Sequence, residues 1–117
     1  ENLLYLPQAK IYRGSCALGP SITLGVPETA AREWQIRMTI LRDGTKAFLG
    51  ETFVRQIKRA FSGLIEHLFR SQQFPHGAVL LTGTGIVPPD DFSLQSGDVV
   101  EIEITGIGKL RNPVGQV

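Results

Sequence analysis

At 117 residues the chain is long enough to form one domain with a modest hydrophobic core. Its 42% hydrophobic and 20% charged residues are typical of a soluble globular protein and exclude a disordered one. A net charge of +1 excludes the broad positive field that binds nucleic acid or an acidic membrane surface, and no apolar run approaches the roughly 20 residues that span a bilayer. We therefore expect a single domain over residues 1–117, with neither nucleic acid nor a membrane as its partner.

Cysteine usage and the first residue bear on the origin of the chain. The lone cysteine, Cys16, cannot form an internal disulfide, which favours a cytoplasmic protein, and we predict that it is an inert small core residue. The chain opens with Glu1 rather than methionine, and no basic and apolar leader follows. We expect a segment upstream of Glu1 to be missing from this sequence.

The first clear element is a hairpin. Apolar and polar residues alternate over 34–41, which is the period of a half-buried strand. The dipeptide Asp43-Gly44 follows, and these residue types suit the positive backbone angles of a tight turn. Residues 46–52 are predicted to return as the partner strand.

A helical period comes next. Apolar residues recur at spacings of three and four and face charged residues, which predicts one amphipathic helix that ends before Pro75. The apolar face comprises Phe53, Ile57, Ala60, Phe61, Leu64, Ile65 and Leu68, and the charged face comprises Arg55, Lys58, Arg59 and Glu66.

The remaining chain is rich in short strands. Residues 78–82 are predicted to form a buried strand, and a glycine- and proline-rich loop follows. Residues 99–105 alternate as another strand, and Gly106 and Gly108 turn the chain into a short final strand. The sum predicts an α+β, β-rich domain with one amphipathic helix.

Several residues with metal-ligand side chains are better explained by structure. Glu101 and Glu103 share one strand face and could hold a hard cation, but alternate charges on a half-exposed strand normally face water. Asp90-Asp91 follows two prolines and fits local turn chemistry. The two histidines, His67 and His76, have no obvious partner in the sequence, so we predict that both lie at the surface.

Five short blocks together carry a resemblance to a known family. They are LPQAK at 6–10, SCALGP at 15–20, LLTGTG at 80–85, GDVVEIEI at 97–104 and GIGKLRNPV at 106–114. In this order and spacing they resemble the C-terminal region of the fumarylacetoacetate hydrolase (FAH) family. The resemblance implies a mixed β-roll, and makes 1–117 the C-terminal part of a catalytic domain whose metal-binding segment is absent from this sequence.

The family likeness also implies a site. Members look like enzymes in which a Glu-x-Glu pair and an Asp, all upstream of this region, hold Mg²⁺ or Mn²⁺, so no metal ligand is expected in this chain. The active-site lysine of the family matches Lys10, and the threonine that receives a substrate carboxylate matches Thr84. Gly83 would let the backbone approach that carboxylate, and Gln8 would support Lys10 or bind the substrate, because side chains two apart on a strand share a face.

Residues 80–92 look most like the branch that dehydrates 2-keto-3-deoxy sugar acids through an enolate that the metal stabilises. Two alternatives stay open, namely a hydrolase that cleaves a carbon–carbon bond of an acylpyruvate, and a non-catalytic binding or scaffold module. A small 2-oxo acid is the expected partner, and a homodimer is expected by analogy with the family.

Overall fold

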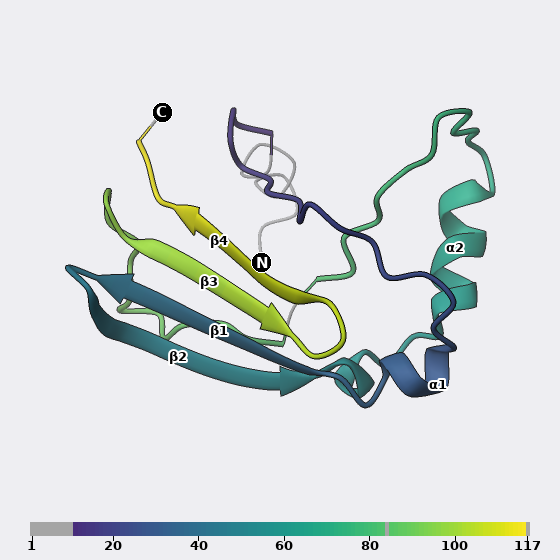
Figure 1. Cartoon of the computed structure of the whole chain (residues 1–117). Coiled ribbons are helices and arrows are strands. Elements are labelled where there is room, and N and C mark those ends of the chain that lie inside the picture. The colour runs from purple at the N-terminus through teal and green to yellow at the C-terminus, as the bar shows by residue number, and fades with distance from the viewer. Residues whose placement is uncertain (1–10, 84, 117) are drawn as a thin grey trace.

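The computed structural model describes residues 11–83 and 85–116. Its central element is a four-stranded antiparallel sheet in the order β2-β1-β3-β4, formed by β1 (Gln35–Arg42), β2 (Thr45–Phe53), β3 (Val99–Ile104) and β4 (Gly108–Pro113). Figure 1 shows the helix α2 (Phe61–Phe69) standing away from this sheet, with extended segments between the two. The predicted α+β, β-rich class with one substantial helix is confirmed.

The hairpin forms as the sequence predicts, with β1 and β2 each within one residue of the predicted bounds. Asp43 and Gly44 have φ angles of 50° and 76°, so both central residues of the turn adopt the left-handed region. This is the geometry of a tight two-residue hairpin turn. Arg42 pairs with Thr45 across it, and the Thr45 hydroxyl donates to the Arg42 carbonyl at 2.8 Å.

The two faces of the sheet differ in chemistry. On one face Ile36, Met38 and Ile40 of β1 lie opposite Ile104, Ile102 and Val100 of β3, so apolar side chains are in register across the strands. Ile40 is 2% exposed and lies in the core, together with Ile86 from the segment that follows residue 84. The other face carries charged pairs, which are Arg37–Glu51, Lys109–Glu101 and Arg111–Glu101.

The predicted helix over residues 53–74 is wrong in its first half. Phe53 belongs to β2 and pairs with Gln35, and a short 3-10 helix, η2 (Val54–Gln56), follows it. Residues 57–60 are not helical, and α2 begins only at Phe61. Tertiary hydrogen bonds override the helical period here, because the amide of Val54 donates to the Trp34 carbonyl at 3.0 Å.

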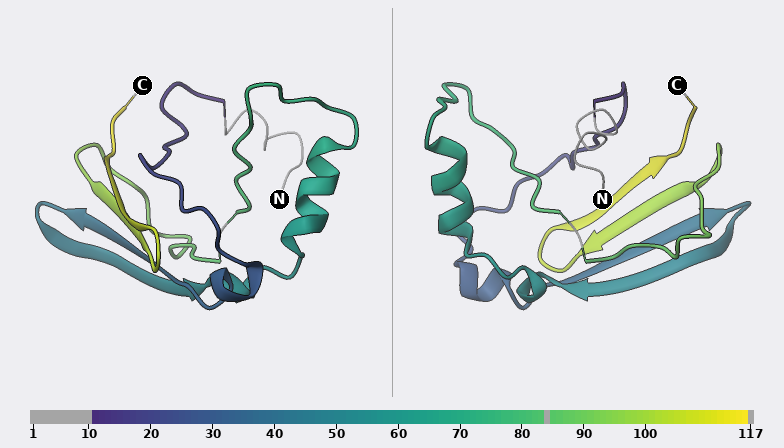
Figure 2. Two further views of the ribbon diagram at one scale, coloured as in Figure 1. Left: turned by 45° about the vertical axis from the view of Figure 1, so that its right-hand side comes forward. Right: turned by 180° about the vertical axis from the view of Figure 1, so that it is seen from behind.

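Two further predictions are wrong. Residues 78–82 form no strand and are not buried, since Val79 and Leu81 are 63% and 64% exposed and no described strand pairs with them. Cys16 is exposed rather than a core residue, because it lies in an extended segment that Figure 2 shows running outside the sheet. In both cases an apolar side chain needs a covering element, which the local pattern does not specify.

Candidate functional site

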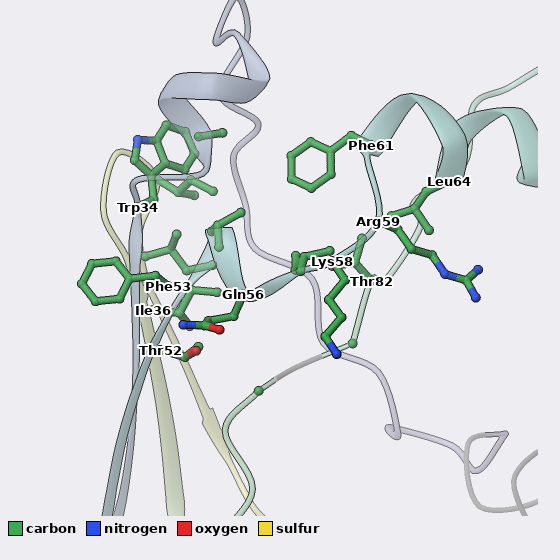
Figure 3. A pocket seen from close by; sticks show the side chains of 17 residues that line it. Trp34, Ile36, Thr52, Phe53, Gln56, Lys58, Arg59, Phe61, Leu64 and Thr82 are labelled. Carbon is green, nitrogen blue, oxygen red and sulfur yellow. The ribbon is translucent and has the colours of Figure 1, made fainter.

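A cavity of about 510 Å³ lies where several parts of the chain meet. Its walls come from the adjoining ends of β1, β2 and β3, from η2 and the residues after it, from the start of α2, and from Thr82, Gly83 and Gly85 (Figure 3). The cavity is lined by Ala31, Trp34, Ile36, Thr52, Phe53, Val54, Gln56, Ile57, Lys58, Arg59, Phe61, Leu64, Thr82, Gly83, Gly85, Ile104 and Ile107.

The walls combine apolar side chains with a few polar ones, and the charged side chains among the described lining residues are all positive. Lys58 and Arg59 are the charged residues of the described lining, and Thr52, Gln56 and Thr82 add neutral polar groups. None of the described lining residues is Asp or Glu. A largely apolar cavity with convergent cationic and hydroxyl groups suits a small organic anion.

Two glycines allow Gly85 and Ile86 to lie close against the sheet. A Cβ on Gly85 would lie 3.3 Å from the hydroxyl of Thr52, and one on Gly50 of β2 would overlap the Cγ2 atom of Ile86. Ile86 is 6% exposed, so it packs into the space that Gly50 leaves. The backbone preceding residue 86 is therefore anchored directly above β2 at the cavity.

A second contact system fixes the opposite wall. The guanidinium of Arg32, which follows the short helix α1 (Glu28–Ala31), donates to the carbonyls of Ile57 at 2.7 Å and Arg59 at 2.8 Å. It also donates to one carboxylate oxygen of Glu28 at 2.8 and 2.6 Å, and that carboxylate accepts the amide hydrogen of Phe61. We call Glu28 and Arg32 the clamp.

The clamp has electrostatic and structural consequences. Hydrogen bonds from Arg32 and from the Phe61 amide lower the pKa of the Glu28 carboxyl below its ordinary value. The Arg32 guanidinium also lies 5.1 Å from the centroid of the Phe61 ring. Because the clamp occupies the carbonyls of Ile57 and Arg59, these residues do not join a helix and α2 starts only at Phe61.

Of the four site residues predicted from the sequence, the structure describes only Gly83. Gly83 lines the cavity and has a φ of +85°, a conformation that glycine adopts without steric cost. Gln8, Lys10 and Thr84 lie outside the described residues. The roles of all four residues remain predictions.

The sequence pattern did not predict that Lys58 and its neighbours Ile57 and Arg59 line a cavity. The helical period placed Lys58 on a solvated helix face, whereas this exposed lysine belongs to the non-helical segment that the clamp holds and lines the cavity. A possible signal was the pair Arg32 and Glu28, four residues apart, but nothing local showed which carbonyls Arg32 would bind.

The other ligand-type residues are dispersed. Glu101 accepts ion pairs from Lys109 at 3.4 Å and from Arg111 at 3.3 Å. Asp90, Asp91, His67 and His76 are exposed. Within residues 11–83 and 85–116, no three His, Cys, Asp or Glu side chains gather as a metal site would require. Over the same residues, no helix is long and apolar enough to cross a membrane.

Comparisons with known proteins show which family this chain resembles. The family described as fumarylacetoacetate (FAA) hydrolase C-terminal matches residues 2–115. The chain is 41% identical over 117 residues to the probable 2-keto-3-deoxyxylonate dehydratase of Haloferax volcanii. It is also 41% identical over 114 residues to the 2-dehydro-3-deoxy-D-arabinonate dehydratase of Saccharolobus solfataricus.

Solved structures show the same likeness in three dimensions. A hexagonal crystal form of 2-keto-3-deoxyarabinonate dehydratase matches 99% of this chain with a TM-score of 0.92 and 40% identity. A 2-keto-3-deoxy-D-arabinonate dehydratase complexed with magnesium and 2,5-dioxopentanoate matches 99% with a TM-score of 0.89 and 39% identity.

The chain belongs to the FAH family, and it corresponds to the C-terminal region of that family. The family resemblance predicted from the five sequence blocks is confirmed. The match to the Haloferax volcanii protein includes 100% of this chain and the match to the Saccharolobus solfataricus protein includes 97% of it. The chain spans only 40% and 38% of the lengths of those two proteins. It covers 40% and 41% of the two solved chains.

Proposed function

We propose that this chain supplies the substrate-carboxylate side of the active site in a dehydratase of 2-keto-3-deoxy sugar acids. The observation that carries the proposal is the cavity, which Gly83, Gly85 and Lys58 line and which no described carboxylate lines. Such surroundings favour an organic anion. The dehydratases of Haloferax volcanii and Saccharolobus solfataricus support the choice of substrate class.

The proposed residue roles follow the family likeness. Thr84, with the backbone at Gly83, receives the substrate carboxylate, and Gln8 supports the substrate or Lys10. Lys10 is the catalytic residue and moves or holds the proton that leaves C3 of the substrate. Loss of that proton and of the C4 hydroxyl together releases one water, which is the balance of a dehydration.

A divalent metal belongs to the proposal for the complete enzyme only. The related dehydratase complexed with magnesium and 2,5-dioxopentanoate supports Mg²⁺, with Mn²⁺ as the alternative. The described residues do not fit a metal, because no three ligand-type side chains gather among them. We propose that its ligands belong to a part of the catalytic domain other than these residues.

The test is an assay of the full-length protein with Mg²⁺ and 2-keto-3-deoxy-D-arabinonate, in which the product is identified. We expect Thr84→Ala to raise KM more than Lys10→Ala does, because it removes a contact made in the ground state. Lys10→Ala should instead act mainly on kcat. Lys46→Ala, on the exposed side of the β1–β2 turn, is the control and should leave both constants unchanged.

The same assay separates the alternatives. Near-normal turnover in both Lys10→Ala and Thr84→Ala would sink the residue assignment. Cleavage of an acylpyruvate carbon–carbon bond in place of dehydration would identify the hydrolase branch. If neither a 2-keto-3-deoxy sugar acid nor an acylpyruvate is converted, the chain is a binding or scaffold module.

Two broader properties complete the proposal. We propose that residues 1–117 act as a single domain and that the protein is a cytoplasmic homodimer, as the family likeness implies. Light scattering on the purified full-length protein tests the dimer, and a mass equal to one chain contradicts it. Limited proteolysis tests the single domain, since an early cut within residues 11–116 would divide it.

A further inference from the structure

We propose that Lys58 is a substrate-binding residue of this site and pairs with the carboxylate of the 2-oxo acid. The inference rests on the proposed function and deepens it by naming a cation that neither the sequence reasoning nor the family likeness assigned. Three observations carry it, namely the position of Lys58 in the cavity, its lack of a carboxylate partner among the described residues, and the clamp that fixes its backbone.

Lys58 lies in the wall of the cavity. Lys58 and Thr82 line the same cavity, although 24 residues separate them in sequence. In Figure 3 the Lys58 side chain lies on the Thr82 side of the cavity, while the Arg59 guanidinium points away from the cavity. Of the two cationic side chains in the wall, Lys58 is thus the one that stays with Thr82 and Gly83 at the cavity.

The charge of Lys58 has no partner in the described part of the chain. Most arginines there have a carboxylate partner, as in Arg32–Glu28, Arg42–Asp98 and Arg55–Glu33. None of the ion pairs among the described residues includes Lys58. A cation at the edge of an apolar cavity with no described acidic lining residue is available to an anionic ligand.

The backbone around Lys58 is held on both sides. The clamp residue Arg32 binds the carbonyl before Lys58, at Ile57, and the carbonyl after it, at Arg59. The amide of Ile57 also donates to the Val54 carbonyl at 3.0 Å. A flexible lysine side chain therefore starts from a fixed point, which lowers the entropy lost when it binds a ligand. In this account Arg32 is a positioning residue and Lys58 is a binding residue.

The experiment compares Lys58→Met with wild type in the full-length protein. We expect KM for 2-keto-3-deoxy-D-arabinonate to rise at least about tenfold with a small change in kcat, because a charge-assisted hydrogen bond is lost from the ground state. Lys58→Arg should restore part of the loss because it keeps the charge. Lys46→Met is the matched control, an exposed lysine in β2 that does not line the cavity, and should leave KM unchanged.

Binding measured without turnover gives an independent readout. Titration calorimetry with 2-oxopentanoate and with 2-pentanone, which lacks the carboxylate, measures how much affinity the carboxylate contributes. Lys58→Met should weaken 2-oxopentanoate binding at least about tenfold and should leave the neutral ketone unchanged. A purely structural role for Lys58 would weaken both ligands alike, and that result would overturn the proposal.

The outcomes separate this inference from the proposed function. If wild type binds and dehydrates the sugar acid but Lys58→Met and Lys58→Gln keep its KM within about twofold, Lys58 is not a carboxylate ligand while the proposed function stands. If wild type neither binds 2-oxopentanoate nor converts the sugar acid, the proposed function fails and the inference fails with it. Thermal melts of each variant show whether a lost activity reflects lost folding.

Discussion

The guanidinium of Arg42 donates to both carboxylate oxygens of Asp98, at 2.9 and 2.8 Å, and so joins the end of β1 to the turn before β3. Asp98 is 1% exposed and also accepts the amide hydrogen of Gln95 at 2.9 Å. Arg42 reaches further, to the carbonyl of Ser93. This arrangement fixes the return of the chain from the loop after the cavity into the central sheet.

The first prediction concerns acid stability. Hydrogen bonds from Arg42 and Gln95 lower the pKa of Asp98 from 3.8 to about 2. The unfolded chain therefore binds the Asp98 proton more tightly than the folded one. The contribution of Asp98 to folding stability is complete above about pH 4 and is lost as the pH falls through about 2. Asp98→Asn should lower the melting temperature at pH 7 and should reduce the loss of stability between those two pH values.

Melting curves from pH 7 to pH 2 check this prediction. Asp91→Asn serves as the control, because Asp91 is exposed and is not among the described ion pairs. Equal acid sensitivity in wild type and Asp98→Asn would contradict the role of the Arg42–Asp98 pair.

The second prediction concerns the clamp. Arg32→Lys keeps the charge but loses the planar set of donors that reaches the Ile57 and Arg59 carbonyls and the Glu28 carboxylate together. We expect the free energy of unfolding to fall by about 1–2 kcal/mol, since each lost hydrogen bond costs on the order of 1 kcal/mol. Amide exchange at residues 57–61 should become faster.

Urea unfolding and hydrogen exchange measure these two effects. The matched control is Arg70→Lys, which alters an exposed pair with Glu66 on α2 and should change stability little. If exchange at residues 57–61 is as slow in Arg32→Lys as in wild type, the clamp does not hold this segment.

The third prediction concerns the fit between Gly50 and Ile86. A Cβ at residue 50 would overlap the Cγ2 atom of Ile86, so Gly50→Ala should destabilise the fold by about 1–3 kcal/mol through overpacking. Ile86→Leu removes the branch that would clash. The double variant Gly50→Ala/Ile86→Leu should therefore be more stable than the sum of the single changes predicts.

A double-mutant cycle in urea measures that coupling. Gly63→Ala is the control for adding a methyl group, because a Cβ there meets no atom within 4 Å and glycine is unfavourable inside a helix. It should stabilise the protein by up to about 1 kcal/mol. Strict additivity of the Gly50 and Ile86 changes would show that the two residues do not pack together.

The amino-acid sequence by itself determined the elements whose signal is local. The alternation over 34–41 and the Asp43-Gly44 dipeptide specify a hairpin, because side-chain period and turn geometry depend on adjacent residues. The same holds for the strands that became β3 and β4. The five sequence blocks also identified the family, since their order along the chain is itself sequence information.

Only the tertiary structure decided where α2 begins and what surrounds Gly83. Arg32 donates hydrogen bonds to the carbonyls of Ile57 and Arg59, so residues with a helical period stay outside the helix and Lys58 lines the cavity. Ile86 packs against Gly50, which brings Gly85 and Ile86 onto a strand more than 30 residues away in sequence. These contacts join residues distant in sequence, and their energies depend on packing and hydrogen-bond geometry that no local pattern encodes.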